Sequence, residues 1–292
     1  MRFAAILFAS IFALAAGATT MSPEAEWKAS LADANVGWAK AHYAVLKIQD
    51  AVYMRDGDTS TLVGIKGKPE SYKWVKGTKA AAVLIAGVRA GHPFVVLNKQ
   101  LYADNQIAKG IPVDTDIDIR GARTQVAAGV IGARIMVFNQ QAKAARDFPG
   151  VDFYSYDPAF RVVATFKQDP ARASRVFRTS RGTDKQFFHA GDATFVLRGK
   201  TIMLPLYAED QKKVEGMSAF FIDEMTGRET YGAGRYVDVE PFGAFPPKTV
   251  TIDFNDAYNP NCARSPFFTC PVATDVVALA VKAGERDPHK AH

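Results

Sequence analysis

Between residues 56 and 138 short apolar runs alternate with turn-forming residues, and this alternation constrains the fold more than any other feature of the sequence. The apolar runs 81–85, 94–97 and 126–130 are too short for ordinary helices and suit strands. Turns spaced about ten residues apart are typical of small antiparallel sandwiches. We therefore predict a small antiparallel β-sandwich over residues 56–139. The turn signals are Asp56-Gly57-Asp58, Lys66-Gly67-Lys68-Pro69, Gly91-His92-Pro93 and Arg120-Gly121-Ala122.

The later part of the chain, residues 151–287, carries strand signals of its own. Within residues 195–204 two apolar triplets flank a glycine-containing turn, which predicts a β-hairpin. Val250, Ile252 and Phe254 alternate with polar residues, so they would share one face of a strand. We expect a second antiparallel sandwich or a barrel-like domain here. The predicted fold class of the whole chain is mainly β.

A helix is predicted before the first sandwich. Ser22-Pro23-Glu24 combines a capping Ser, a Pro in the first turn and an acid that the helix dipole favours. We expect this helix to run to about Asn35, since Gly37 interrupts an apolar spacing that otherwise continues to Val52. The predicted segments are a signal peptide 1–18, a helical N-terminal segment 19–55, the small sandwich 56–139, a connector 140–150, the second β domain 151–287 and a tail 288–292.

The first eighteen residues have the three parts of a secretory signal peptide. Arg2 supplies a basic start, residues 3–15 an apolar core, and Ala16-Gly17-Ala18 a cleavage site of small residues. An uncleaved membrane anchor is the alternative, but the apolar core is too short to span a bilayer of about 30 Å. We therefore expect an exported protein, periplasmic or secreted, with no transmembrane segment after cleavage behind Ala18.

Charge and motifs exclude several functions. The net charge of +6 becomes +5 when the signal peptide with its single Arg is removed, and no block of like charge is present. Nucleic acid is therefore not an expected partner. The chain lacks the GxSxG, HExxH and GxxxxGK[ST] signatures, and we expect no cofactor. His189, at a turn, could serve as a general base, but no nucleophile elbow accompanies it.

Two groups of residues have the spacing of metal ligands. Asp114, Asp116 and Asp118 would project from one side of a strand, but no glycine-bearing twelve-residue Ca²⁺ loop surrounds them. We expect these three acids to form a solvated strand face. His289 and His292 lie in the C-terminal tail, where such a spacing is more often incidental. No metal site is predicted.

Cys262 and Cys270 are the only cysteines of the chain. In an exported protein two cysteines so close in sequence usually form a disulfide, and the intervening Arg264-Ser265-Pro266 can turn the chain between them. The alternative is half of a metal site, for which the nearest histidines are remote. We predict a disulfide between Cys262 and Cys270.

Three stretches of the C-terminal half contain uncommon motifs. They are TGRETYGAGRYVDVE, TIDFNDAYNPNCARSPFFTCP and KAGER. In this order they resemble domain-of-unknown-function family 1684, an uncharacterised bacterial and archaeal family, and the likeness extends through residues 148–166 and 194–206. Members often have two glycines before the arginine, where this chain has Ala233-Gly234. The region from Trp27 to Phe138 is similar to the variable extension of longer members and, more distantly, to a degenerate forkhead-associated sandwich.

The polar residues of these stretches form the candidate site. Gly232 and Gly234 permit a bulge or the close approach of another group, and Arg235 can offer a fork of donors to a carboxylate or phosphate. The site is either a buried polar network that joins two sheets or a pocket for an anion. We expect Arg235 to be largely buried and to pair with a carboxylate, Asp253 being the first choice. The candidate residues are Tyr231, Arg235, Tyr236, Asp238, Asp253, Asn255, Tyr258, Asn259 and Glu285.

Three classes of function stay open. A protein that binds a small anionic ligand would use Arg235 as its anchor, and an envelope-interaction module would use the sandwich surfaces. These two are the leading predictions. The alternative is a hydrolase with Asp253 or Glu285 as general base and a tyrosine assisting. The sequence specifies neither the ligand nor the oligomeric state.

Overall fold

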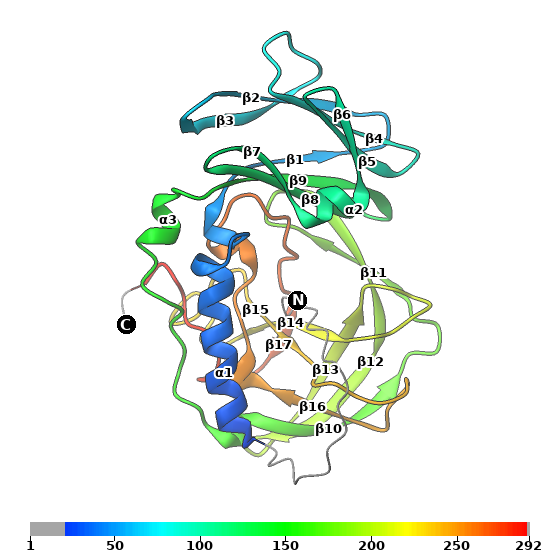
Figure 1. Ribbon diagram of the computed structural model, residues 1–292. Coiled ribbons are helices and arrows are strands. Elements are labelled where there is room, and N and C mark those ends of the chain that lie inside the picture. Colours follow the sequence, from blue (N-terminus) through cyan, green and yellow to red (C-terminus); the bar gives the residue numbers. More distant parts are fainter. Residues whose placement is uncertain (1–20, 291–292) are drawn as a thin grey trace, which may run out of the picture.

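Residues 21–290 are described by a computed structural model, which shows one long helix beside several β-sheets (Figure 1). The predicted mainly β fold class is confirmed. The predicted signal peptide, residues 1–18, lies outside the described residues. No helix within residues 21–290 is long and apolar enough to cross a membrane.

The N-terminal helix α1 (Pro23–Asn35) begins and ends where the sequence predicts. Ser22 caps it with its side-chain oxygen, as expected for a Ser before Pro. A π-helical turn (Val36–Lys40) then extends it, so Gly37 changes the helix type without ending the helical path. Val52 continues the helical spacing in the sequence but lies in strand β1 (Ile48–Met54). Pairing with a neighbouring strand overrides the local helical pattern there.

Nine strands form a sandwich of two antiparallel sheets. Their bounds are β1 (Ile48–Met54), β2 (Thr59–Ile65), β3 (Lys68–Lys76), β4 (Leu84–Arg89), β5 (His92–Leu97), β6 (Gln100–Ala103), β7 (Ile111–Asp114), β8 (Ile117–Ala127) and β9 (Val130–Asn139), with helix α2 (Asp104–Lys109) before β7. One sheet has the order β1-β9-β8-β7 and the other β3-β2-β4-β5-β6. Leu62, Val95, Ile117 and Ile135 are fully buried between them, which makes this a packed core.

The three alternating acids of this region do not share a strand face, so that prediction is wrong. Asp114 ends β7 and Asp118 lies in β8, while Asp116 falls in the turn that joins these antiparallel strands. Asp118 is 7% exposed and lies 3.0 Å from His42 Nε2. Within residues 21–290 no group of three or more His, Cys, Asp or Glu side chains could hold a metal ion.

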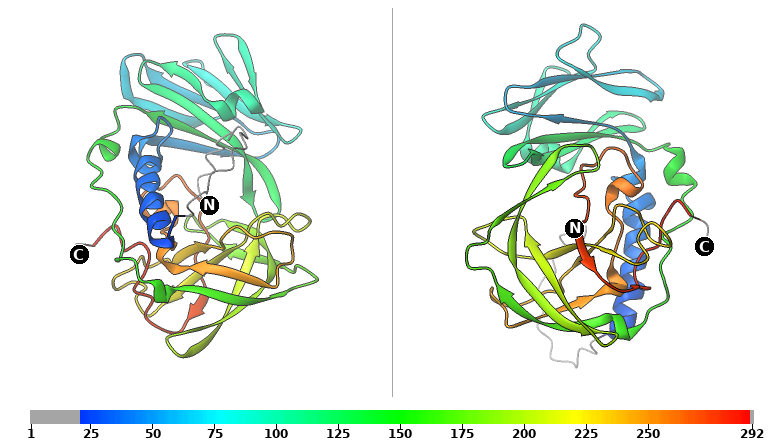
Figure 2. Two further views of the ribbon diagram at one scale, coloured as in Figure 1. Left: turned by 60° about the horizontal axis from the view of Figure 1, so that its bottom comes forward. Right: turned by 180° about the vertical axis from the view of Figure 1, so that it is seen from behind.

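Residues 161–277 form a third sheet, which is curled (Figure 2). Its strands are β10 (Arg161–Gln168), β11 (Ser174–Arg178), β12 (Asp184–Leu197), β13 (Lys200–Ala208), β14 (Ser218–Asp223), β15 (Arg235–Asp238), β16 (Thr249–Asp253) and β17 (Asp275–Val277). Its order is β15-β14-β13-β12-β10-β16, with β11 beside β12 and β17 parallel to β14. Val239 bridges Ile252, so the two ends of the sheet approach one another and a half-barrel results.

The hairpin and the buried face that the sequence predicts are both present in this sheet. Arg198 and Gly199 form a two-residue turn between β12 and β13, with φ of 51° and 77°. Positive φ at both positions gives the twist that matches the flanking strands. Val250, Ile252 and Phe254 all point into the core of the half-barrel.

The two β units meet along a seam. Trp38 and Phe138 on one side pack in a single cluster with Phe268 on the other. Gln125 of β8 and Gln186 of β12 exchange two hydrogen bonds of 2.8 and 2.9 Å through side chain and main chain. Helix α1 lies against the second unit, although the sandwich separates them in sequence (Figures 1 and 2). The connector carries the short helix α3 (Lys143–Arg146).

Candidate functional site

Arg235 is buried in an ion pair, as the sequence predicts, but its partner is Asp223. Arg235 Nη2 lies 2.9 Å from Asp223 Oδ2, and the two side chains are 1% and 0% exposed. The pair arises from strand register, because Arg235 on β15 stands opposite Phe221 on β14, two residues before Asp223. Nη2 also donates to the carbonyl oxygen of Val281 at 2.9 Å, and Nη1 donates to that of Ala283.

Burial lowers the pKa of Arg235, and the negative charge of Asp223 opposes this effect. Asp223 Oδ2 also accepts a hydrogen bond of 3.1 Å from the main-chain N of Val281. The guanidinium group therefore has protein partners on both terminal nitrogens and is closed off from solvent. Arg235 braces the core and is not in a position to bind an external anion.

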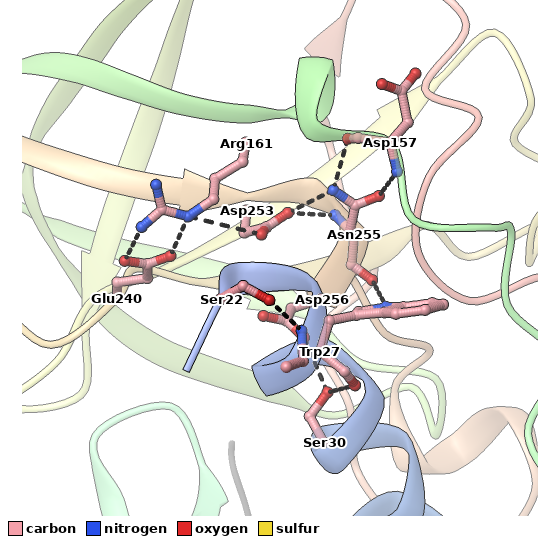
Figure 3. Close-up of polar contacts among 10 residues, drawn as sticks. Ser22, Trp27, Ser30, Asp157, Arg161, Glu240, Asp253, Asn255 and Asp256 are labelled. Carbon is pink, nitrogen blue, oxygen red and sulfur yellow. Dashed lines mark hydrogen bonds and ion pairs between the residues drawn. The ribbon is translucent and has the colours of Figure 1, made fainter. Parts of the chain in front are cut away.

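Asp253, the partner first expected for Arg235, belongs to a different cluster (Figure 3). Its Oδ1 accepts from the main-chain N of Asn255 at 2.9 Å and from its side-chain Nδ2 at 2.8 Å. Its Oδ2 lies 3.9 Å from Arg161 Nε, and Arg161 is held mainly by Glu240 through contacts of 2.8 and 3.0 Å. Burial raises the pKa of Asp253.

Asn255 continues this cluster toward the N-terminal helix (Figure 3). Its amide exchanges two hydrogen bonds with the main chain of Asp157, at 2.9 and 3.0 Å. Its carbonyl oxygen accepts a 3.0 Å hydrogen bond from Trp27 Nε1, and Ser30 Oγ donates to Asp256 Oδ1 at 3.0 Å. The Asp253 cluster therefore fixes helix α1 and the loop before β10 to the half-barrel.

Glu285 and Asn259 form a third buried group. Glu285 Oε2 accepts from the main-chain N of Asn259 at 2.7 Å, and Oε1 lies 2.8 Å from Arg264 Nη2. Burial raises the pKa of Glu285, while Arg264 acts in the opposite direction. Asn259 Nδ2 donates to the carbonyl oxygen of Arg286 at 2.7 Å. The main-chain oxygen of Glu285 lies 3.4 Å from Arg235 Nη1, which links this group to the Arg235 pair.

The four remaining candidate residues are tyrosines and one acid. Tyr236 donates its hydroxyl to the carbonyl oxygen of Pro271, and burial raises its pKa. Tyr258 donates to Asp238 Oδ1 at 3.2 Å. Tyr231 is half-buried beside Cys262, and burial raises its pKa to about 12.

These positions favour the network interpretation over the pocket at Arg235. A concavity of about 780 Å³ lies instead on the outer face of the sandwich, over β5 and β6. Neither Asp253 nor Glu285 lines it, so the two proposed general bases face no substrate space there. His189 is also occupied, since its ring nitrogens lie 3.2 Å from Asp169 and 3.0 Å from Asp192.

Cys262 and Cys270 are both free thiols in the structure. The predicted disulfide is therefore not seen and stays a prediction. The main-chain N of Cys262 donates to Cys270 Sγ at 3.4 Å, which places the two residues side by side. Hydrogen bonds from Cys270, and then from Ser180 and Tyr231, lower the pKa of Cys262 to about 7.

Comparison with known proteins bears on the second half of the chain. Residues 146–286 match the family described as "Protein of unknown function (DUF1684)". Residues 146–286, which match this family, are called the DUF1684 half of the chain. It is similar to an uncharacterised protein of Haloarcula marismortui with a solution NMR structure, at 29% identity and a TM-score of 0.44, over 51% of this chain and 82% of that chain. No curated protein matches the chain. The match confirms the family resemblance drawn from the sequence for residues 146–286. The resemblance of the region from Trp27 to Phe138 to a variable extension stays a prediction.

The seam between the sandwich and the DUF1684 half gathers cations that the sequence did not single out. Arg134 lies with its guanidinium carbon 4.6 Å from the ring centre of Phe268 and 5.9 Å from that of Tyr53. Arg181 lies 5.7 Å from the same Tyr53 ring, and Lys185 is close by on β12. They come from separate segments, so only the folded chain brings them together.

Proposed function

We propose that this is an exported protein that binds a small anionic ligand at the seam between its two β units. The observation that carries the proposal is the set of three cations at the seam, Arg134, Arg181 and Lys185. Within residues 21–290 none of the three makes an ion pair with a carboxylate. By contrast, Arg161, Arg235 and Arg264 each form an ion pair with an acid.

The electrostatics of Lys185 support an anion at this place. Burial lowers the pKa of Lys185, and the positive charge of Arg134 lowers it further, while Cys270 and Glu209 act in the opposite direction. A bound carboxylate or phosphate would favour the charged form of each cation. The planar Arg134 and Arg181 groups suit bidentate recognition of such an anion, and their aromatic neighbours Tyr53 and Phe268 hold them in place.

Export is part of the same proposal and rests on the sequence. Arg2, the apolar residues 3–15 and the small residues 16–18 support cleavage behind Ala18 and release into the periplasm or medium. Intact-mass measurement of exported material should give a chain that begins at Thr19. A full-length chain retained in the membrane would contradict export without bearing on the seam.

A thermal-shift screen of small anions on the mature protein tests the binding proposal. A specific ligand at about 100 times its Kd should stabilise the fold by on the order of 2–3 kcal/mol. Arg134→Gln should abolish that shift, because it removes a charge from the seam. Arg198→Gln is the matched control, since Arg198 is exposed and pairs with Asp157 on the surface. A shift that survives Arg134→Gln, or the absence of any stabilising anion, would contradict the proposal.

A second candidate function, contact with the cell envelope, is favoured by the concavity on the sandwich. Phe94, Val96 and Leu101 line it, and Leu101 is 64% exposed, so apolar side chains gather at one place on this surface. Leu101→Glu should reduce co-sedimentation of the protein with envelope fractions. Met203→Glu is the control, since Met203 is equally exposed at 64% and lies on β13. Equal loss in both variants would point to a general effect of charge.

A further inference from the structure

Cys262 and Cys270 differ in their exposure to solvent, so a reagent in solution can reach Cys262 more easily than Cys270. Cys262 is half-buried and lies in the 3-10 turn Asn261–Ala263, directly after Pro260, whereas Cys270 is 8% exposed. The main-chain N of Cys262 donates to Cys270 Sγ at 3.4 Å, so the buried sulfur is held against the backbone of the more accessible residue. An accessible thiol with a second thiol beside it is the arrangement that thiol–disulfide exchange requires.

Neighbouring segments hold the two thiols in this position. Ser180 pairs with Cys270 in both directions, through Ser180 N to the Cys270 carbonyl oxygen at 2.9 Å and Cys270 N to Ser180 Oγ at 3.5 Å. The hydroxyl of Tyr231 hydrogen-bonds to the side chain of Cys262. Lys185 adds positive charge near Cys270. The side chains of Ser180 and Tyr231 both hydrogen-bond to Cys262, which stabilises its thiolate.

We infer that Cys262 and Cys270 form a thiol–disulfide exchange site, with Cys262 as the attacking thiolate and Cys270 as the resolving thiol. The substrate class is a small disulfide that can reach the half-buried Cys262. Hydrogen bonds that lower the pKa of Cys262 to about 7 keep a large fraction of it ionised at neutral pH. The hydrogen bond to Cys262, and then burial, raise the pKa of Cys270 and keep it protonated.

The reaction balances without a further reagent. The Cys262 thiolate attacks one sulfur of the small disulfide RSSR, which forms a Cys262–S–S–R bond and releases RS⁻. Cys270 then loses its proton to solvent or to RS⁻ and attacks Cys262 Sγ, which forms the Cys262–Cys270 bond and releases a second RS⁻. The protein dithiol is oxidised by two electrons, and RSSR is reduced to two thiols. The predicted disulfide is thus the oxidised state of a reversible pair.

Acid-quenched mass spectrometry of the reduced mature protein with hydroxyethyl disulfide tests this inference. The wild type should lose two hydrogens and retain no adduct. Cys270→Ser should stop as a mixed disulfide at Cys262, since a serine hydroxyl can still donate to the thiolate but cannot resolve it. Cys262→Ser should react at least about tenfold more slowly, because its remaining thiol is buried and protonated.

A second pair of variants covers the case in which a cysteine variant folds poorly. Tyr231→Phe should slow the first step at pH 6 by at least about twofold, since it removes a donor to the thiolate. Tyr102→Phe is the control, as Tyr102 contacts Gln100 on the sandwich and should leave the rate unchanged. Equal rates for the two cysteine variants, a stable adduct on the wild type, or reaction only in denaturant would overturn the inference. Because the probe is uncharged, these results do not depend on anion binding at the seam.

Discussion

The indole Nε1 of Trp27 donates a 3.0 Å hydrogen bond to the main-chain oxygen of Asn255, 228 residues later in the chain. The next turn of α1 adds a contact of 3.0 Å from Ser30 Oγ to Asp256. At the far end of the helix, Asn35 Oδ1 accepts from the main-chain N of Val151 at 2.9 Å. The first helix is therefore a structural part of the DUF1684 half, and the sandwich stands between the two pieces in sequence (Figure 1).

Trp27→Ala should destabilise the protein by about 3–5 kcal/mol, because it empties a buried site and removes the hydrogen bond to Asn255. Trp27→Phe keeps most of the apolar contact and should cost less, about 1–3 kcal/mol, mainly by leaving a buried carbonyl oxygen without its donor. Urea unfolding gives both values. Lys28→Ala, at an exposed site of the same helix, should stay within about 0.5 kcal/mol. A cost for Trp27→Ala no larger than for Lys28→Ala would show that α1 is not docked.

Limited proteolysis should cut the connector 140–150 first, because several of its residues, such as Lys143, are exposed and it carries only a four-residue helix. The two fragments should nevertheless elute together in size-exclusion chromatography, since α1 stays bound to the half-barrel through Trp27 and Ser30. Separation of the fragments without denaturant would count against the docking of α1. First cuts inside residues 190–260 would count against the division of the chain.

Much of the architecture follows from local patterns in the sequence. Ser22-Pro23 predicts the start of α1, and the turn at Arg198-Gly199 predicts the hairpin, because each signal acts within a few residues. The prediction that Asp114, Asp116 and Asp118 share a strand face failed, because a spacing of two residues does not reveal a turn that interrupts the strand. The physical cause is the same in each case: structure that depends on residues close in sequence can be predicted, and structure that depends on distant residues cannot.

At the candidate site, too, local features could be predicted from the sequence and long-range contacts could not. Burial of Arg235 could be expected from its glycine-flanked strand, but its partner depends on the register of β14 with β15, which the alternating Asp253 and Asn255 do not reveal. Asp223 ends β14, and only the pairing of β14 with β15 identifies it as the partner of Arg235. The seam cations Arg134 and Lys185 meet only through tertiary packing, so no local pattern points to them.

Arg235→Ala should lower the free energy of unfolding by about 3–5 kcal/mol, because it leaves the fully buried Asp223 without its counter-charge. Arg198→Ala, which breaks an exposed pair with Asp157, should cost at most about 1 kcal/mol. Chemical denaturation of the mature protein measures both. An Arg235→Ala variant as stable as Arg198→Ala would mean that Arg235 does not brace the core.

Gly234 should tolerate no side chain, whereas Gly232 should. Gly234 has a φ of +83°, and a Cβ there would lie 2.4 Å from Ala273 Cβ and 2.7 Å from the carbonyl oxygen of Phe221. Gly234→Ala should therefore cost at least about 1–3 kcal/mol from backbone strain alone. A Cβ on Gly232 meets only Gly227 Cα, at 4.0 Å, so Gly232→Ala is the matched control and should be close to neutral. Equal melting temperatures for the two variants would contradict the described loop geometry.

Protonation of Asp114 should contribute to the loss of folding stability at acid pH. Hydrogen bonds from the main-chain N of Gly67, and then from Thr115 and the hydroxyl of Tyr72, lower the pKa of Asp114 below its ordinary value of 3.8. A carboxyl group whose pKa is lower in the folded state stabilises the fold above the unfolded-state pKa. That stability is lost as the pH falls through the folded pKa, which here means from about pH 4 downward.

Asp114→Asn should therefore be less stable than the wild type at neutral pH, and the two should converge as the pH falls below about 4. Urea midpoints measured at a series of pH values give this comparison. Tyr72→Phe removes one donor, the 2.9 Å hydrogen bond to Asp114 Oδ2, and keeps the ring in the sandwich core. It should show the same convergence with a smaller amplitude. Parallel loss of stability in the wild type and Asp114→Asn down to pH 3 would mean that the hydrogen bonds at this turn do not lower the pKa of Asp114.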